Sequence, residues 1–595
     1  MAIMPSTSQD RDNDYATAND LTARQRTFQR DPIVTVAASS SAAPVASGRQ
    51  PTAGSAALRY GPASQASGLA ILLAMSHSAE SDKSSRQPDR QNLTCRTRAY
   101  PPAPARPHAG ETALYPRHDT AAMLGVVSDR TAAQASSGLR ATRLPGVSHR
   151  KPSGWPDIRH RTNVIMIMAA SVAALYTVQT LAWPHSPLPS STLMHAWSLA
   201  SVLWLSAAVP AACELAGLLM HRYPRNLGRV RPIPQLVCWR IVSRGINTEA
   251  LTATIRRCRA ESRANPLFRY VIEVVTDTSH DGLPEPAPDL IYIRVPTSYR
   301  TPGATRNKAR ALQYALQQSR LPDDAWVVHL DEETRPTASG IRGIARMIDE
   351  EEKTGRLRIG QGTIVYHRDW KAHPFFTLSD CVRTGSDLGR LYLSMRIGVP
   401  LFGLHGSYIV VRNDVEKRVG FDVGPIGSIT EDAFWGCQQM QAGHRCRWVD
   451  GYLEEQCTQS VPDFMKQRRR WFNGLVKVAV FAPVKLRWRL VIGISMAAWA
   501  LAPLAWAYTL AHFALGGYID PWVRAVANGS FAVYITTTII GLKVNLAEHG
   551  VTSRFRRTGW CLGWLMLMPV FSLMESASVA YAMVRPTNSF HVVKK

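Results

Sequence analysis

Hydrophobic and polar positions follow three different patterns along this chain. Residues 1–155 are rich in Ser, Ala, Pro, Thr, Gln and Arg and show no sustained periodicity. Such a composition buries too little apolar surface to offset the entropy that ordering would cost. We therefore expect a basic, disordered tail over residues 1–155. The alternative is that part of this region is never translated and the true start lies downstream.

Five long apolar segments follow, two before and three after a central region of mixed polarity. Each approaches or exceeds the roughly 20 residues that a helix needs to cross hydrocarbon. The segments cover residues 163–183, 193–220, 490–515, 523–546 and 559–584. The sequence therefore predicts two transmembrane helices within residues 160–222 and about three within residues 488–585.

Arginines flank the first pair of apolar segments, whereas the loop PHSPLPSST between them carries no Lys or Arg. By the positive-inside rule both flanks are cytoplasmic, which predicts a multi-pass membrane protein with a cytoplasmic central domain. Five crossings would place the C-terminal RPTNSFHVVKK on the far side, which its lysines disfavour. Alternatives are a re-entrant segment and an interfacial stretch at WFNGLVKVAVFAPVKL.

Strand-like and helix-like patterns alternate between residues 230 and 482. We expect strands at 235–245, 268–277, 289–296 and 325–333, and helices at 247–263 and 306–319. This alternation is typical of an α/β domain with a mostly parallel, doubly wound sheet. Ligands of such sheets bind beyond the carboxyl ends of the strands, which is where Asp277 and Asp331 fall.

The chain carries 69 Lys and Arg against 44 Asp and Glu, a formal net charge of +25. That excess suits an anionic membrane surface, a phosphate-bearing substrate or nucleic acid. No nucleic acid is expected, because zinc-finger spacing, a basic-zipper pattern and an RNA-binding aromatic signature are all missing. The nine scattered cysteines form no CxxC pair, which argues against a disulfide framework or a zinc site.

Three acids, Asp331, Glu332 and Glu333, directly follow the strand-like VVHL. Acids at the end of a buried strand destabilise the fold unless a cation compensates them. Mg²⁺ and Mn²⁺ prefer such oxygen ligands and bridge them to diphosphate oxygens. If the backbone stays extended, Asp331 and Glu333 face one cleft and Glu332 points away. The alternative, a solvated loop, is disfavoured by the buried strand.

Two further motifs carry candidate chemistry. In GSITEDAFWG, Thr430 is expected to cap a helix, with Glu431 and Asp432 in its first turn. A carboxylate at a helix start facing a cleft also suits a general base. In FMKQRRRWFNGL, arginines can neutralise a leaving diphosphate and Trp471 can stack on a sugar. The alternative for this second motif is a solvated or membrane-facing basic patch.

In this order, the strand-end acids, TED and QxxRW resemble the motifs of family-2 glycosyltransferases. HLDEET, GQGTIVY, PLFGLHGSYIVV, VGFDVGPIGSITEDAFW and QRRRWFNGL resemble more closely the egghead-type β-1,4-mannosyltransferase family. The resemblance covers about residues 235–480. It implies a GT-A fold, a nucleotide-sugar donor with GDP-mannose favoured, and a lipid-linked or glycan acceptor at the membrane.

The resemblance also implies roles on the donor side of the site. Arg244 and Asp277 would contact the nucleotide, and Lys308 would meet ribose or phosphate. Asp331 and Glu333 would hold Mn²⁺ or Mg²⁺. The family more often has Asp in the third place of this triplet, so Glu332 competes with Glu333 as a ligand.

On the acceptor side, the resemblance implies that Gly406 and Ser407 shape the sugar and acceptor pocket. Asp432 would be the catalytic base, with Glu431 the less favoured choice. The acceptor channel and the product diphosphate would be lined by Gln467, Arg470 and Trp471. Together these roles describe an inverting transfer that forms a β-glycoside. Two alternatives remain, a processive β-polysaccharide synthase that uses a UDP-sugar and a catalytically silent scaffold that binds nucleotide sugar.

Overall fold

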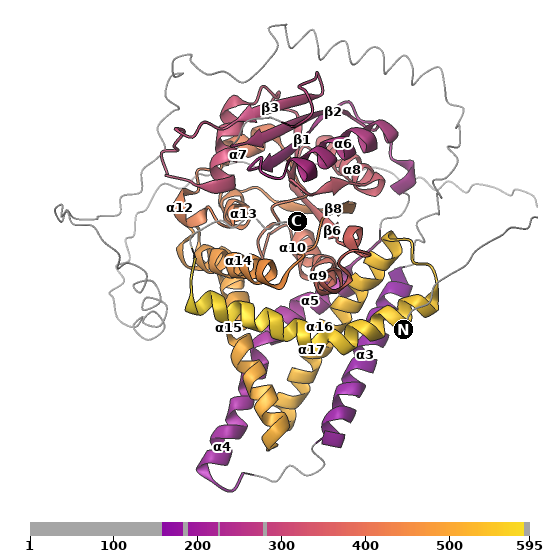
Figure 1. Ribbon diagram of the computed structural model, residues 1–595, viewed down its shortest axis with the longest axis vertical. Helices are drawn as coiled ribbons and strands as arrows, with labels where there is room; N and C mark the ends of the chain where they lie inside the picture. The colour runs from indigo at the N-terminus through magenta and orange to yellow at the C-terminus, as the bar shows by residue number, and fades with distance from the viewer. Residues whose placement is uncertain (1–156, 183–188, 224–226, 278–281, 588–595) are drawn as a thin grey trace, which may run out of the picture. The chain divides into compact units, whose positions relative to one another are not determined.

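The protein is described by a computed structural model over residues 157–182, 189–223, 227–277 and 282–587. The predicted disordered tail, residues 1–155, lies outside the described residues. Within them, an α/β domain is joined to long apolar helices (Figure 1).

An eight-stranded sheet, in the order β3-β2-β1-β4-β7-β6-β8-β5, forms the centre of the α/β domain. Its strands are β1 (Leu236–Ser243), β2 (Arg269–Thr276), β3 (Leu290–Arg294), β4 (Trp326–Asp331), β5 (Arg335–Pro336), β6 (Ile359–Val365), β7 (Ile409–Arg412) and β8 (Cys446–Glu454). The first four are mutually parallel, and β7 runs antiparallel to both of its neighbours. The predicted mostly parallel sheet is confirmed, and its four predicted strands are β1 to β4.

Helices cover both faces of the sheet (Figure 1). They are α6 (Thr248–Ala264), α7 (Asn307–Gln318), α8 (Ala338–Thr354), α9 (Pro374–Ser386), α10 (Tyr392–Ile397), α11 (Asn413–Val419), α12 (Gly424–Gly427), α13 (Glu431–Gln441) and α14 (Val461–Phe481), with short turns η2 (Leu227–Arg229), η3 (His367–Asp369) and η4 (Asp387–Leu391). Successive residues of a strand point to opposite faces. Accordingly, Cys238 and Val242 of β1 join one hydrophobic core with α7 and α13, while Trp239 and Ile241 join another with α6 and α8.

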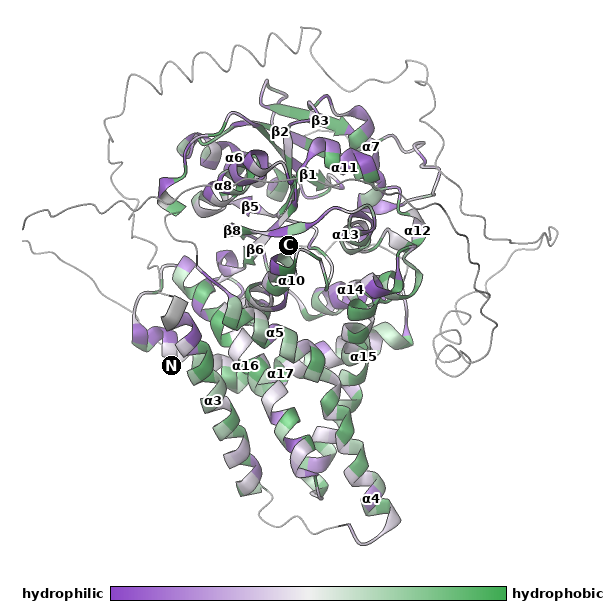
Figure 2. Ribbon diagram, turned by 180° about the vertical axis from the view of Figure 1, so that it is seen from behind, coloured by the Kyte–Doolittle hydropathy of each residue, from purple (hydrophilic) through white to green (hydrophobic). Residues whose placement is uncertain are grey.

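The apolar segments are helical. They form α3 (Asp157–Ala182), the run α4 (Thr192–Leu199), η1 (Ala200–Ala207) and α5 (Ala208–Met220), and the long helices α15 (Leu486–Leu515), α16 (Pro521–Glu548) and α17 (Arg554–Val584). Among the described residues, five helical stretches are long and apolar enough to cross a membrane. Figure 2 shows hydrophobic residues dominating these helices, whereas the α/β domain is mixed.

The strand register brings the polar strand ends together. Ser243 at the end of β1 pairs with Thr276 of β2, and Val242 pairs with Asp331 of β4. The carboxyl ends of three adjacent parallel strands therefore share one edge, where such sheets bind ligands.

Candidate active site

The strand β4 ends at Asp331, the first of the three acids, and Glu332 and Glu333 do not continue it. The backbone turns, and the N–H of Thr334 donates to the carbonyl oxygen of Asp331 over 3.0 Å. Ser243 donates a hydrogen bond to the carboxylate of Glu332. The expectation that an extended backbone turns Glu332 away is therefore wrong, because a turn after Asp331 brings all three acids to the wall of one cavity.

A buried lysine joins the strand-end acid to the TED motif. Lys308, in the first turn of α7, places Nζ 2.5 Å from Oδ1 of Asp331 and 3.5 Å from Oε1 of Glu431. It also donates to the carbonyl oxygen of Gly406 over 3.0 Å. The carboxylates outweigh burial and raise the pKa of Lys308, so this cation is held permanently between the acids.

The loop before β7 fits closely around this cluster. A Cβ atom added to Gly406 would lie 3.0 Å from Nζ of Lys308 and 3.3 Å from Oδ2 of Asp432. Only a residue without a side chain allows the backbone to approach so closely. The next residue, Ser407, donates from Oγ to Oδ2 of Asp331 over 2.9 Å. The loop therefore fixes the orientation of the strand-end carboxylate.

Asp432 lies half-buried in the first turn of α13. Burial, reinforced by the neighbouring Glu431, raises the pKa of Asp432 to about 7, and Lys308 opposes that shift. A carboxylate with a pKa near neutrality can take a proton from a hydroxyl more readily than an ordinary aspartate. The position and the raised pKa both suit a general base.

The TED motif is locked to α14 by close packing. Thr430 occupies the N-cap position of α13, but its side chain makes no capping hydrogen bond, so the predicted side-chain cap is wrong. A Cβ atom added to Gly474 of α14 would lie only 2.4 Å from Cγ2 of Thr430. The side chain of Thr430 therefore packs against α14 instead of capping α13.

Near the ends of β1 and β2, the cavity wall contains one residue that the sequence analysis missed. Asp277, just beyond β2, forms a 2.6 Å ion pair with Arg310 of α7. Both line the cavity, as does Arg244 beyond β1. The signal for Arg310 was a further basic residue in RNKARAL, two positions after Lys308.

On α14, the ring of Trp471 makes contact with two guanidinium groups. Arg468 and Arg383 lie 4.5 Å and 4.8 Å from the centroid of its ring. Arg468 is buried and pairs with Asp380 over 2.8 Å and with Glu575 over 3.0 Å. Cation–π contacts of this kind hold an aromatic ring in one orientation. The structure thus adds Arg383 and Arg468 to the predicted Gln467, Arg470 and Trp471.

All twelve predicted site residues line a single cavity of about 1760 Å³. They are Arg244, Asp277, Lys308, Asp331, Glu333, Gly406, Ser407, Glu431, Asp432, Gln467, Arg470 and Trp471. From this polar end the cavity continues between α3, α5, α15, α16 and α17, where most lining residues are apolar. It therefore connects the strand-end acids with the interior of the helical bundle.

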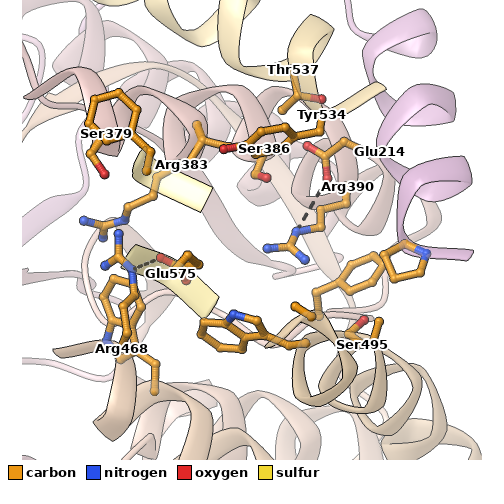
Figure 3. Close-up of a pocket in the computed structure, with 18 of the residues that line it drawn as sticks. Glu214, Ser379, Arg383, Ser386, Arg390, Arg468, Ser495, Tyr534, Thr537 and Glu575 are labelled. Atoms are coloured by element: carbon orange, nitrogen blue, oxygen red, sulfur yellow. Dashed lines mark hydrogen bonds and ion pairs between the residues drawn. The ribbon is translucent and has the colours of Figure 1, made fainter. Parts of the chain in front are cut away.

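Several charged residues line the cavity (Figure 3). Arg383, Arg468 and Glu575 lie on one side of the view, and Glu214 and Arg390 lie on the other. Glu214 of α5 is 3.6 Å from Arg390, and the backbone carries a π-helical turn at η4. Such turns are frequent at functional sites. No motif or spacing in the sequence singles out Arg383, Arg390, Glu214 or Glu575.

The family profile described as Glycosyl transferase family group 2 matches residues 326–574. Beta-1,4-mannosyltransferase bre-3 of Caenorhabditis briggsae is 31% identical over 429 residues, 69% of this chain and 91% of the relative. Its counterpart in Caenorhabditis elegans is 30% identical over 428 residues, with the same coverage. Beta-1,4-mannosyltransferase egh of Drosophila melanogaster is 29% identical over 375 residues, 60% of this chain and 78% of the relative.

Solved structures show more distant similarity. Mannosyltransferase PcManGT from Pyrobaculum calidifontis, in complex with GDP-Man and Mn²⁺, aligns with a TM-score of 0.35 and 16% identity. The alignment covers 70% of this chain and 98% of that chain. Staphylococcal TarS residues 1–349 with UDP align with a TM-score of 0.24 and 11% identity, over 59% of this chain and 90% of that chain.

Proposed function

The chain belongs to the family-2 glycosyltransferases of the bre-3 and egghead type, and we propose that it is an inverting enzyme that transfers mannose from GDP-mannose to a membrane-embedded acceptor. Its relatives are named as β-1,4-mannosyltransferases, so the product is a β-mannosyl linkage. The acceptor is a lipid-linked sugar or glycan.

The observation that carries this proposal is the position of Asp432. Its carboxylate lies beside Gly406, on the wall of the same cavity that continues between the apolar helices. A donor bound at the strand ends and an acceptor entering from the membrane would meet at this point. With a pKa of about 7, Asp432 takes the proton from the attacking hydroxyl.

The transfer requires two bond changes. The deprotonated acceptor oxygen attacks the anomeric carbon of mannose, and the bond from that carbon to the diphosphate oxygen breaks. Direct displacement inverts an α-linked donor to a β-glycoside. The departing nucleoside diphosphate carries the electron pair away, and the nearby cations Lys308 and Arg470 stabilise its negative charge.

The acids at the end of β4 fit a divalent cation that arrives with the donor. Among the residues that the structure describes, no three His, Cys, Asp or Glu side chains form a complete ligand set. Mg²⁺ usually binds one or two carboxylates and completes its shell with water and substrate phosphates. Asp331 and Glu333, both on the cavity wall, would be those ligands for Mn²⁺ or Mg²⁺. When bound, the ion neutralises diphosphate charge.

The apolar part of the cavity supports an acceptor with a lipid tail. Its walls come from helices that are long and apolar enough to cross a membrane. The apolar wall favours binding of a hydrocarbon chain. The charged side chains that line the same cavity, such as Arg383, Arg390 and Arg468, offer hydrogen bonds to sugar hydroxyls. Orienting the catalytic domain toward the cytoplasm would give it access to GDP-mannose.

The test is Asp432→Asn in membranes supplied with labelled GDP-mannose and a glycolipid extract. Loss of a positioned base should lower turnover by about 10² to 10⁴ while GDP binding is retained. The matched control is Asp349→Asn, which removes an exposed carboxylate on α8 that pairs with Lys353. Near-normal turnover by Asp432→Asn would eliminate the assignment of the base.

Substrate identity needs a separate measurement. A panel of GDP- and UDP-sugars, with and without EDTA and added Mn²⁺, should show the highest transfer with GDP-mannose and loss on metal removal. A product with one added sugar supports single transfer. A polymer made from a UDP-sugar would instead establish the processive alternative.

A further inference from the structure

The first half of α17, although apolar enough to cross a membrane, is bordered by the α/β domain. Trp560 packs edge to face against Trp370, which directly follows η3, with ring centroids 4.7 Å apart. Further along, Phe571 packs against Phe375 of α9, with centroids 4.9 Å apart. Both partners belong to the chain between β6 and β7.

The second half of α17 is held by α14, the helix that carries Trp471 into the cavity. Arg468 forms its 3.0 Å ion pair with Glu575 in this half. Arg469 donates from Nε to the backbone oxygen of Arg585, directly after the helix, over 2.6 Å. The end of α17 therefore also remains beside the catalytic site.

The length of α17 allows these contacts to distinguish a crossing helix from one that stays on one side of the membrane. Residues 560 and 585 are separated by about 37 Å of helix at about 1.5 Å per residue, which exceeds the roughly 30 Å of a hydrocarbon core. A crossing helix would carry one of these positions to the opposite membrane surface. Instead both contact the same domain. Figure 1 shows α17 running across the bundle, at a large angle to α3 and α15.

The two faces of α17 differ in a way that suits this orientation. The inner face buries polar and aromatic side chains, among them Trp564, Ser572 and Ser576. The outer face exposes a row of aliphatic side chains at helical spacing, Leu562, Met566, Val570 and Leu573. A helix with one such apolar face lies in the plane of the membrane surface with that face in the acyl chains.

The beginning of α17 supplies charge for the same surface. Arg554, Arg556 and Arg557 form its first turn, which contains no acid. Between them Phe555 is 88% exposed. Basic residues beside an exposed aromatic side chain complement anionic lipid headgroups.

We propose that α17 is an interfacial helix that lies on the catalytic side of the membrane, with its Leu562–Met566–Val570–Leu573 face in the lipid. The chain then crosses the membrane four times, through α3, the run from α4 to α5, α15 and α16. An even number of crossings places the chain before α3 and the chain after α17 on the same side as the α/β domain. Five crossings would place the lysines of the C-terminal segment on the far side of the membrane, which the positive-inside rule disfavours. Four crossings avoid this.

The test measures membrane depth along the outer face. In the full-length protein in liposomes, a genetically encoded spin-labelled amino acid replaces Leu562, Met566, Val570 or Leu573 one at a time. Collision with oxygen, relative to a water-soluble nickel complex, reports the depth of each label. If α17 lies at the interface, the four labels should all be in lipid, at similar and shallow depths. A steady change of about 16 Å from 562 to 573, as a crossing helix requires at about 1.5 Å per residue, would overturn it, and so would four labels in water.

A second measurement tests the topology independently of these substitutions. A protease-cleavable tag is placed after Lys595, in the exposed turn at Gly355 after α8, or in the turn at Gly517 between α15 and α16. In sealed vesicles, the tags after 595 and at 355 should be cleaved together, and the tag at 517 should be protected when they are cut. Cleavage of the 595 tag together with the 517 tag would establish a fifth crossing.

Discussion

The Nζ atom of Lys308 lies 2.5 Å from Oδ1 of Asp331, which ties the first turn of α7 to the end of β4. Both residues also belong to a larger set of charges, because the same ammonium reaches Glu431 in the first turn of α13. One lysine, with a side chain that is 10% exposed, thus connects the end of β4 with the helix that carries the proposed base.

Replacing Lys308 with Met should weaken donor binding and lower turnover together. The substitution keeps an unbranched side chain but leaves Asp331 without its cation and removes the charge that lowers the pKa of Asp432. We expect at least about a tenfold rise in the dissociation constant of GDP, measured by calorimetry, since a charged hydrogen bond contributes about 1.5 to 3 kcal/mol. Lys353→Met, at an exposed pair, is the control and should leave binding unchanged.

Turnover should increase as the pH rises through about 7. Only the ionised form of Asp432 accepts a proton, and burial raises the pKa of this group to about 7. The check is kcat measured with saturating donor and acceptor from about pH 5 to about pH 9. A profile that is flat through neutrality would contradict this assignment.

The raised pKa of Asp432 also makes the stability of the fold depend on pH. Stability should fall as the pH rises, whereas turnover should increase. Because the pKa of Asp432 rises from 3.8 to about 7 on folding, the native state binds a proton that the unfolded state has released in that interval. The stability that this group contributes is present below about pH 4 and is lost as the pH rises through about 7. Asp432→Asn should therefore raise the Tm relative to the native chain more at pH 8 than at pH 5, measured by thermal unfolding in detergent.

Gly406→Ala should impair catalysis in a folded protein. The new methyl group would lie 3.0 Å from Nζ of Lys308 and 3.3 Å from Oδ2 of Asp432, so these side chains must move. We expect kcat to fall about tenfold or more, because small displacements at a reacting centre are costly. The matched control is Gly529→Ala in α16, where a Cβ atom would meet nothing within 4 Å. A normal kcat for Gly406→Ala would refute the close fit.

Arg383→Met should act on the acceptor rather than on the donor. Arg383 stacks on the ring of Trp471 from α9 and helps to hold the ring on the cavity wall. Loss of one cation–π contact, about 1 kcal/mol or more at a desolvated site, should raise the KM for the acceptor about fivefold to tenfold. Donor hydrolysis in the absence of acceptor should not change. Arg263→Met, at a side chain that is 71% exposed, is the control.

Much of the α/β domain was predictable because its signals are local. The runs of β-branched and aliphatic residues in β1 to β4 and the periodicity of α6 and α7 lie within a few turns of chain. The strand-end acids were found because a change from apolar to acidic residues marks the end of a buried strand. The strand predicted at 325–333 extends two residues beyond the observed end of β4 at Asp331. The hydrogen bond that closes the turn after Asp331 has no sequence signature.

The apolar segments, the parallel half of the sheet and the acidic and basic motifs of the site could be predicted from the sequence, because each depends on residues that are close together in the chain. Folding is needed to bring Lys308 to Gly406, 98 positions away, and Arg468 to Glu575, 107 positions away. The contacts of α17 with Trp370, Phe375 and α14 are likewise long-range, and its composition suits either a crossing or an interfacial helix. Burial and long-range contact raise the pKa of Asp432 and hold Trp471 in place, and neither can be computed from the order of residues alone.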